Sequence, residues 1–282
     1  MATADRLLSV LGLFTLEEPE WTVERAAERL GASISTTYRY FSSLSAVGLI
    51  ESLTAGVYVL GPAIVEYDRQ IRLLDPLLKV SRPILQRLVE MADQKGVALL
   101  CRRYRQQVMC VHQEVGSAAD PTVGYERGRP MGLVRGAASQ AILAHMPSRL
   151  LKALILEIPE RLMSAAGLGR NWDEFRVKLK GMRTAGVCVT RGQIDPGKVG
   201  IASPILYPKD VVIGSVGIAL SEADSTNQML ARVSTLVRAA AREIEAALAE
   251  HEGFALPPAI ETERRKRTTG RGVSRQVNGR PG

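Results

Sequence analysis

The sequence predicts an α+β protein with two folded parts and a short basic tail. Its 282 residues exceed the length of one typical domain. Residues 3–61 contain three helical segments followed by two short β-prone runs. From residue 97 onward, pairs of alternating apolar strands are flanked by helices, which is typical of an antiparallel sheet covered by helices.

The first part has the pattern of three helices and a hairpin. Apolar residues recur at helical spacing over residues 3–17, and residues 22–31 form a second helix that Thr22 caps and Gly31 ends. Ser33 opens a third helix, which Gly48 ends. The apolar face predicted for this third helix carries Ile34, Tyr38, Phe41 and Leu44. Two β-prone runs around Thr54-Ala55-Gly56 follow, so the order is that of a winged helix-turn-helix.

The second part is predicted as a helical linker and a sheet domain. Residues 62–95 are helical but interrupted by prolines at positions 76 and 83, which suits a linker helix and then a domain's opening helix. A hairpin is expected across Arg105-Gln106-Gln107. Further helices are expected at 136–146, 148–157, 171–185 and 224–252, and strands within 186–192, 199–207 and 211–220. The predicted boundaries are 1–61 for the winged domain, 62–80 for the linker helix, 81–253 for the sheet domain and 254–282 for a disordered tail.

Composition excludes several classes of protein. Hydrophobic residues make up 46% and charged residues 23%, which is ordinary for a globular protein. No charge-free apolar stretch is long enough to cross a membrane, and the N-terminus lacks the pattern of a secretory signal. Three cysteines without metal-ligand spacing favour a reducing compartment, so a cytoplasmic protein is expected.

The positive charge lies outside the winged domain. The chain carries a formal net charge of +8, yet residues 1–72 sum to −3 and residues 261–282 to +5. Bulk charge therefore gives no argument for DNA binding by the first part. The tail has almost no apolar residue and is predicted to be disordered.

The third helix carries the candidate DNA-binding residues. Short hydroxyl side chains and an arginine suit a helix in the major groove, where they contact phosphates and base edges. Residues 31–50 contain no acid, although the domain as a whole is acidic. A plain three-helix bundle with a polar surface is the alternative that spacing alone leaves open. The candidates on this helix are Ser33, Ser35, Thr36, Arg39, Tyr40 and Ser43.

Several segments together resemble one family. RLLSVLGLF, TVERAAERLGASISTTYRYFSSLSAVGLIE and VYVLGP are similar to the winged domain of the IclR family of bacterial transcription regulators. GAASQAILA, GVCVTRGQIDPGKVGIASPI and VVIGSVGIAL resemble that family's effector-binding domain, which has a GAF-like fold. The resemblance covers residues 4–250 in one register. It implies a homodimer or homotetramer that binds double-stranded operator DNA and a small organic acid.

Two departures from the family pattern remove positive charge. The family's wing usually carries an arginine where this chain has Gly56-Val57-Tyr58. Ile34 stands where the family often has a basic residue. Phosphate contacts are therefore expected elsewhere, and the arginine-rich tail is one candidate.

The resemblance also implies an effector site in the second domain. Backbone N–H groups at a helix N-terminus suit a carboxylate, and Arg135 or Arg191 is a candidate charge partner. Gly217 and Ala219 stand where relatives can carry hydroxyls, which favours a roomier, apolar pocket for an aromatic or hydrophobic acid; core packing is the equally weighted alternative at these two positions. The implied effector-binding residues are Arg135, Gly136, Ala137, Ala138, Ser139, Thr190, Arg191, Gln193, Asp195, Ser203, Gly217 and Ala219.

No pattern in the sequence points to catalysis, a metal or a cofactor. The cysteines lie in apolar strand patterns, and His112 and His145 have no spacing that predicts a triad or a metal site. No phosphate-binding loop or hydrolase motif is present. We therefore expect a non-enzymatic, effector-responsive regulator, repressor or activator, of a catabolic operon. The alternative is a small-molecule sensor or carrier whose helix-turn-helix has degenerated into a protein-interaction module.

Overall fold

The computed structural model describes residues 3–251 and divides the chain into two compact units, which meet between Asp75 and Pro76. The predicted tail, residues 254–282, lies outside the described residues. In the part that is described, no helix combines the length and apolar character needed to cross a membrane.

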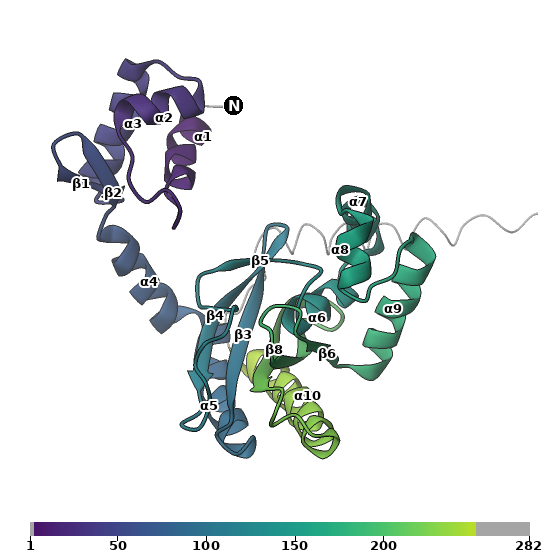
Figure 1. The fold of residues 1–282 in the computed structure, drawn as a ribbon. Coiled ribbons are helices and arrows are strands. Elements are labelled where there is room, and N and C mark those ends of the chain that lie inside the picture. Colours follow the sequence, from purple (N-terminus) through teal and green to yellow (C-terminus); the bar gives the residue numbers. More distant parts are fainter. Residues whose placement is uncertain (1–2, 252–282) are drawn as a thin grey trace, which may run out of the picture. The chain divides into compact units, whose positions relative to one another are not determined.

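Unit 1 has the predicted order of three helices, a hairpin and a further helix (Figure 1). Its elements are α1 (Thr3–Ser9), a 3-10 turn (Val10–Leu13), α2 (Val23–Leu30), α3 (Ile34–Ala46), β1 (Ile50–Thr54), β2 (Val57–Leu60) and α4 (Ala63–Leu74). The Thr22 side chain accepts a hydrogen bond from the N–H of Arg25, and Gly31 ends α2 in the left-handed region with φ 60°. Both helix-end predictions are confirmed, because the Thr22 side chain and the Gly31 backbone N–H pair with backbone groups that a helix terminus leaves unsatisfied.

Trp21 joins the hairpin to the helices. Its backbone exchanges hydrogen bonds of 3.0 and 2.9 Å with Tyr58 of β2, so the segment before α2 extends the two-stranded wing. The Trp21 indole donates to the Leu13 carbonyl at 2.9 Å, and the Tyr58 ring meets Phe41 edge-on at a centroid distance of 4.9 Å. These contacts fix the wing against the body of the unit.

The predicted linker, residues 62–80, is divided between two helices. α4 ends at Leu74, and Pro76 begins α5 (Pro76–Met91), whose residues belong to the second unit. The break has a local cause, because a proline disfavours helical geometry in the residue before it; Asp75 accordingly takes an extended conformation with ψ 118°.

Unit 2 is built on a six-stranded antiparallel sheet in the order β5-β4-β3-β8-β7-β6. The strands are β3 (Gly96–Tyr104), β4 (Gln107–Val115), β5 (Pro130–Gly132), β6 (Cys188–Arg191), β7 (Lys198–Leu206) and β8 (Val212–Ser221). The β3–β4 hairpin turns at Arg105 and Gln106, as predicted. β3 pairs with β8, which is more than a hundred residues further along the chain.

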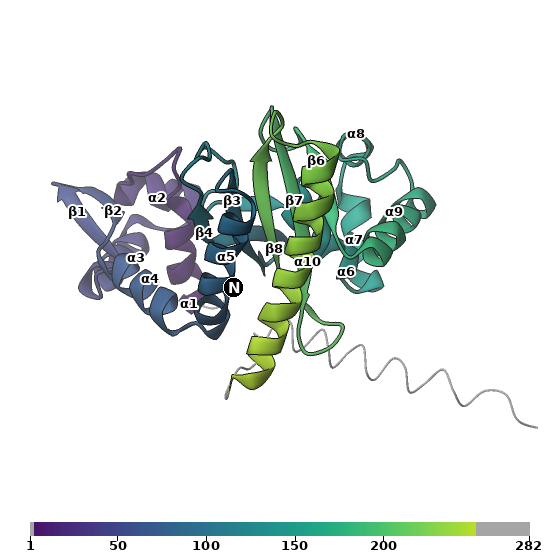
Figure 2. The same ribbon diagram turned by 90° about the horizontal axis from the view of Figure 1, so that it is seen from below.

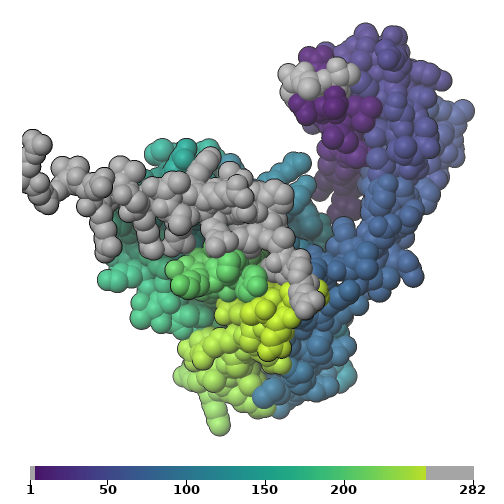
Figure 3. Space-filling model, turned by 180° about the vertical axis from the view of Figure 1, so that it is seen from behind, coloured from purple at the N-terminus to yellow at the C-terminus, as the bar shows by residue number. Residues whose placement is uncertain are grey.

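Helices cover both faces of this sheet. α5 and α10 (Asn227–Glu250) pack on one face, where they lie side by side (Figures 2 and 3). The other face carries α6 (Ala137–His145) and α9 (Trp172–Ala185), with α7 (Ser148–Glu157) and α8 (Glu160–Ala165) beside them. The predicted α+β class with an antiparallel sheet between helices is confirmed. β5 and α8 were not predicted.

Candidate functional sites

The first candidate site is the exposed face of α3. Ser33 caps the helix: its hydroxyl oxygen accepts the N–H of Thr36 at 3.2 Å and lies 2.8 Å from the Thr36 hydroxyl. Ser35, Arg39 and Ser43 are exposed, and Thr36 is partly exposed. Five of the six predicted DNA-binding residues can therefore be reached from solvent, although Ser33 and Thr36 also hold the helix end.

Tyr40 is a correction to the predicted face. Only 7% of Tyr40 is exposed, and it lies in the core of unit 1 with Phe41 and Leu44. The buried stripe of α3 is Thr37, Tyr40, Phe41 and Leu44, which is the i, i+3, i+4, i+7 pattern of one helix face. Tyr40 therefore supports the helix from inside and cannot reach a base.

Ile34 and Tyr38 are a second correction, opposite in sense to Tyr40. They were predicted to face the core, but they are 58% and 61% exposed, on the same helix as Arg39. The face was misassigned because the buried stripe contains a polar residue, Thr37. With Thr37 set aside, positions 34, 38 and 41 form an apolar stripe whose helical spacing is as regular as that of the true one. The accessible face of α3 thus combines two apolar side chains, several hydroxyls and one guanidinium.

Acidic residues outnumber basic ones in unit 1, and residues 1–72 carry a net charge of −3. The wing turn contains Gly56, with φ 80°, and the uncharged Val57. Arg25 forms an ion pair with Glu18 at 3.3 Å and lies over the Trp21 ring at 4.7 Å. The electrostatic attraction for phosphate in unit 1 is accordingly weak.

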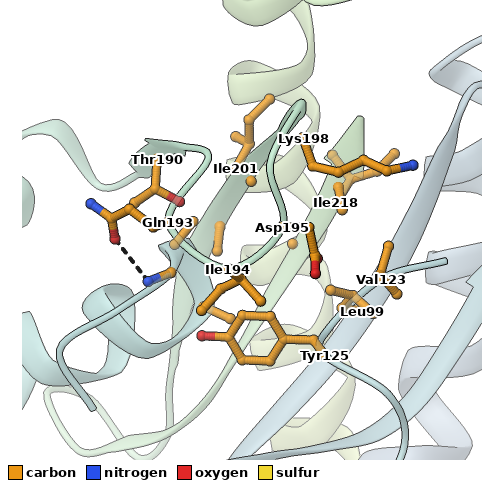
Figure 4. A pocket seen from close by; sticks show the side chains of 17 residues that line it. Leu99, Val123, Tyr125, Thr190, Gln193, Ile194, Asp195, Lys198, Ile201 and Ile218 are labelled. Atoms are coloured by element: carbon orange, nitrogen blue, oxygen red, sulfur yellow. Dashed lines mark hydrogen bonds between the residues drawn. The ribbon is translucent and has the colours of Figure 1, made fainter. Parts of the chain in front are cut away.

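The second candidate site is a cavity of about 40 Å³ between the sheet, the start of α6 and the turn after β6 (Figure 4). Eight of the twelve predicted effector-binding residues line it. These are Gly136, Ala137, Ala138, Thr190, Gln193, Asp195, Gly217 and Ala219. Sequence reasoning missed the others, which are Leu99, Val123, Tyr125, Ile194, Lys198, Gly200, Ile201, Ala202 and Ile218.

Four predicted effector residues do not line the cavity. Arg191 is exposed and lies 3.6 Å from Glu222, and the guanidinium of Arg135, which is also exposed, donates to the Gln193 carbonyl. The Ser203 hydroxyl donates to the Gly186 carbonyl at 2.8 Å. Ser139 is fully buried beside the cavity, where its hydroxyl lies 2.7 Å from the Tyr125 hydroxyl. The cavity therefore receives neither predicted arginine.

The start of α6 is held by protein groups. The Gly136 N–H donates to the Gln193 side-chain oxygen at 2.9 Å, and the Ser139 N–H donates to the Tyr125 oxygen at 3.3 Å. Gln193 also donates to the Ala166 carbonyl at 3.0 Å. Two of the backbone groups predicted to hold a carboxylate are thus already satisfied.

The Gly136 backbone is shaped for this contact. It adopts φ 84°, and a Cβ at this position would lie 2.6 Å from the Tyr125 hydroxyl. Glycine is therefore required both by the backbone angle and by the approach of the tyrosine. Burial raises the pKa of Tyr125, so its hydroxyl stays protonated and can donate to the Arg135 carbonyl at 2.9 Å.

One lining cation and one lining anion remain. The Asp195 carboxylate accepts the N–H of Gly124 at 2.7 Å. The Lys198 ammonium lies 2.7 Å from the Asp120 carboxylate, and only 15% of the Lys198 side chain is exposed. In Figure 4, Lys198 lies on the far side of the cavity from Thr190 and Gln193.

The cysteines show no sign of activation. All three are buried. Burial raises the pKa of Cys188 to about 12, and a hydrogen bond with Cys110 together with burial raises the pKa of Cys101. Raised values keep a thiol protonated and poorly nucleophilic. Among residues 3–251, no group of three or more His, Cys, Asp or Glu side chains is placed to hold a metal ion.

Both units match models of known domain families. Residues 3–53 match the IclR helix-turn-helix domain, and residues 74–246 match the bacterial transcriptional regulator IclR C-terminal domain. A curated relative carries the name "Probable HTH-type transcriptional regulator ArcR" and comes from Halobacterium salinarum. It is 26% identical over 230 residues, which cover 80% of this chain and 86% of the relative.

Solved structures share the fold. An IclR transcriptional regulator from Alicyclobacillus acidocaldarius superposes with a TM-score of 0.71 at 17% identity, over 87% of this chain and 98% of the other. An IclR homologue from Microbacterium hydrocarbonoxydans, crystallised with 4-hydroxybenzoate, gives a TM-score of 0.69 at 20% identity. That match covers 89% of this chain and 100% of the other.

Proposed function

Because the chain belongs to the IclR family of bacterial transcriptional regulators, we propose that it binds operator DNA through α3 and that a small organic acid in unit 2 modulates this binding. The protein acts in the cytoplasm in this proposal, and the genes that it controls form a catabolic operon. The single observation that carries the DNA-binding role is the composition of the exposed face of α3.

That face suits direct readout in the major groove. Arg39 can pair with the two acceptors on a guanine edge, and short hydroxyls such as Ser35 and Ser43 fit phosphates or bases. The exposed side chains of Ile34 and Tyr38 add apolar area that can contact thymine methyl groups. Such a mixture predicts recognition of particular base edges rather than of charge alone.

The effector role is supported by the small residues around the cavity. Gly200 and Ala219 keep the lining small, and the remaining lining is mostly apolar. Gly217 also serves packing, because a Cβ there would lie 2.5 Å from the Ile201 carbonyl oxygen. The Microbacterium hydrocarbonoxydans homologue was crystallised with 4-hydroxybenzoate, an aromatic acid. We therefore propose an aromatic or hydrophobic acid as the effector class for this chain.

A second candidate function is a sensor or carrier whose unit 1 binds another protein. The net charge of −3 over residues 1–72 and the uncharged wing favour it. The absence of acids from residues 31–50 favours DNA, because a surface that no longer reads DNA has no reason to stay free of carboxylates.

A salt titration separates the two functions. Binding to the DNA upstream of the chain's own gene is measured between roughly 50 and 200 mM salt, alongside random DNA of the same length. A regulator binds the upstream DNA more tightly at every salt concentration, with a linear fall of log K against log salt. Equal, weak binding to both DNAs would favour the protein-interaction alternative.

The regulator is proposed to act as a homodimer or a pair of dimers. A single winged module buries only about 600–1,000 Å² on DNA, which rarely specifies a site. A two-fold assembly would read a palindromic operator with half-sites about one helical turn apart. Exposed apolar residues on α4 are the candidates for the contact between copies.

A further inference from the structure

A loop over the cavity is fastened by two charged side chains that lie three residues apart, just before and at the start of β7. We name residues 117–125, which follow β4, the strap, because Val123 and Tyr125 close one side of the cavity. The strap receives contacts from Asp195, in the segment that joins β6 to β7, and from Lys198, the first residue of β7. Asp195 accepts the Gly124 N–H, and the Lys198 ammonium binds the Asp120 carboxylate at 2.7 Å and its carbonyl at 3.4 Å.

Lys198 faces two environments. Its side chain is 85% buried and lines the cavity, whereas the side chain of its partner, Asp120, is 57% exposed. An ammonium carries three N–H donors, and both acceptors that the described residues offer it here lie on Asp120. A cavity occupant with a carboxylate can therefore approach the same ammonium from the inner side.

The cavity is too small for an aromatic ring while the strap is fastened. Its volume is about 40 Å³, whereas a protein cavity that binds benzene measures roughly 150 Å³. Loosening the strap enlarges the space, because Val123 and Tyr125 form part of the wall. The Lys198–Asp120 pair is the contact that an anion can replace, because the Asp120 side chain is 57% exposed and its carboxylate can return to water.

We propose that the ammonium of Lys198 binds the carboxylate of the effector, which replaces the Asp120 carboxylate and so loosens the strap. This inference rests on the proposed organic-acid function and assigns its charge partner. The other predicted partners are unsuited, because Arg135 and Arg191 lie outside the cavity lining and two N–H groups of α6 already have acceptors. Asp195 repels an anion, which orients the effector's carboxylate towards Lys198.

Asp120 is an effective competitor at every physiological pH. The hydrogen bond from Lys198, assisted by hydrogen bonds from Thr122, lowers the pKa of Asp120 to about 2. The Asp120 carboxylate is therefore ionised and competes with the effector's carboxylate for the Lys198 ammonium. Removing the charge of Asp120 removes this competition and tightens binding of the effector. This gives two substitutions with opposite expected effects.

The test measures calorimetric affinity for three acids, each paired with its neutral amide: acetate, benzoate and 4-hydroxybenzoate. We expect the wild type to prefer at least one acid over its amide by tenfold or more. Lys198→Met should abolish that preference and Lys198→Arg should keep it, which guards against misfolding of the first variant. Asp120→Asn should tighten acid binding several-fold more than amide binding, because only the acids gain the freed charge of Lys198. Lys178→Met, an exposed lysine on α9, is the matched control and should behave as the wild type.

The hydrogen-exchange rates of the strap amides distinguish the proposal from a purely structural role of Lys198, in which binding of an acid would leave these rates unchanged. Binding of the preferred acid should speed exchange of the Thr122 and Gly124 amides, because Asp120 leaves its place. If acids bind and the preference survives in Lys198→Met, the assignment of Lys198 is wrong while the organic-acid function stands. If none of the three acids binds the wild type, both this assignment and the proposed effector class are overturned.

Discussion

Arg39 and Tyr40 are neighbours in the sequence with opposite environments. Arg39 is exposed on α3, whereas Tyr40 packs in the core of unit 1. If the exposed face reads bases, Arg39→Ala should weaken binding to the cognate site by about 1–3 kcal/mol and bind random DNA nearly as well as the wild type. Electrophoretic mobility shifts on both DNAs measure this. An equal loss on random DNA would reduce Arg39 to a phosphate contact.

Tyr40→Ala serves as the contrasting variant. It removes a buried aromatic ring and should lower the free energy of unfolding by about 3–5 kcal/mol, so its DNA-binding defect would follow from unfolding. Ile34→Ser should leave unfolding almost unchanged, because Ile34 is 58% exposed, while altering base preference. If Ile34→Ser unfolds the protein, the face described here is wrong.

His145, near the end of α6, makes the stability of unit 2 depend on pH. Burial lowers its pKa below the ordinary value near 6.5, Arg183 lowers it further, and a hydrogen bond to the Ala141 carbonyl and the charge of Asp210 act against this. The unfolded chain thus binds a proton at a higher pH than the folded chain does. The contribution of neutral His145 to the free energy of unfolding is therefore fully present above pH 6.5 and is lost as the pH falls below it.

Urea unfolding at pH 7.5, 6.5 and 5.5 tests this sign. The wild type should lose more stability between pH 6.5 and 5.5 than His145→Gln, because the variant has no proton to take up at this position. His112 and His251 are present in both proteins, so their contributions cancel in the comparison. A larger loss in the variant would contradict the lowered pKa.

At the scale of elements, local chemistry in the sequence was informative and pairing between distant segments was not. Thr22, Ser33 and Gly31 marked helix ends correctly because capping depends on a few adjacent residues. The three-residue strand β5 and the six-residue helix α8 were missed because such short elements show no periodicity. The placement of β3 between β4 and β8 depends on long-range packing, which no local pattern reveals.

The candidate pocket shows the same division. Its small residues, such as Gly217 and Ala219, could be assigned from the family resemblance and line the cavity. Lys198 could not, because a lysine after Asp195-Pro196-Gly197 has the sequence pattern of a solvent-exposed turn. Only the fold places its stem against the sheet and leaves 15% of its side chain exposed.

Gln193 joins the turn after β6 to α6 and to the segment after α8. Replacing it with leucine leaves the buried Gly136 N–H without its acceptor, whereas the Ala166 carbonyl keeps a donor, the Gln140 side-chain amide at 2.9 Å. An unsatisfied buried group costs about 1–3 kcal/mol, so Gln193→Leu should lower the free energy of unfolding by that amount. Denaturant unfolding measures it, with the exposed Gln228→Leu as the control, whose change should stay within about 0.5 kcal/mol. Equal effects would mean that the hydrogen bonds of Gln193 contribute nothing.

At the scale of the whole molecule, α4 carries an apolar surface that unit 1 does not cover. None of its residues is buried, and Tyr67, Ile71 and Leu74 follow one helix face with exposed fractions of 48%, 53% and 63%. If this face joins two copies, Leu74→Glu should shift the protein towards monomer at micromolar concentration, because a carboxylate is costly in an apolar contact. Light scattering measures the shift.

Val65→Glu is the matched control for this experiment. Val65 is 71% exposed and lies about half a turn away from Leu74 around the helix. The control should remain a dimer and bind a palindromic operator as the wild type does. A monomeric wild type, or equal dissociation of both variants, would remove α4 from the contact between copies.

The seven residues from Gly192 to Lys198 make contacts through three side chains to two elements, α6 and the strap. Gln193 binds α6, Asp195 binds the backbone of the strap, and Lys198 binds its carboxylate. The effects of substitutions at distant sites on the free energy of unfolding add within about 0.3–0.5 kcal/mol. Substitutions in one short segment do not add in this way, because the residues are neighbours on the same backbone. The free energy of unfolding of paired variants in this segment therefore departs from the sum of the single effects. An occupant of the cavity that displaced one of these contacts would bear on the others, because one short segment carries all three side chains. The segment is in this sense a junction between α6 and the strap.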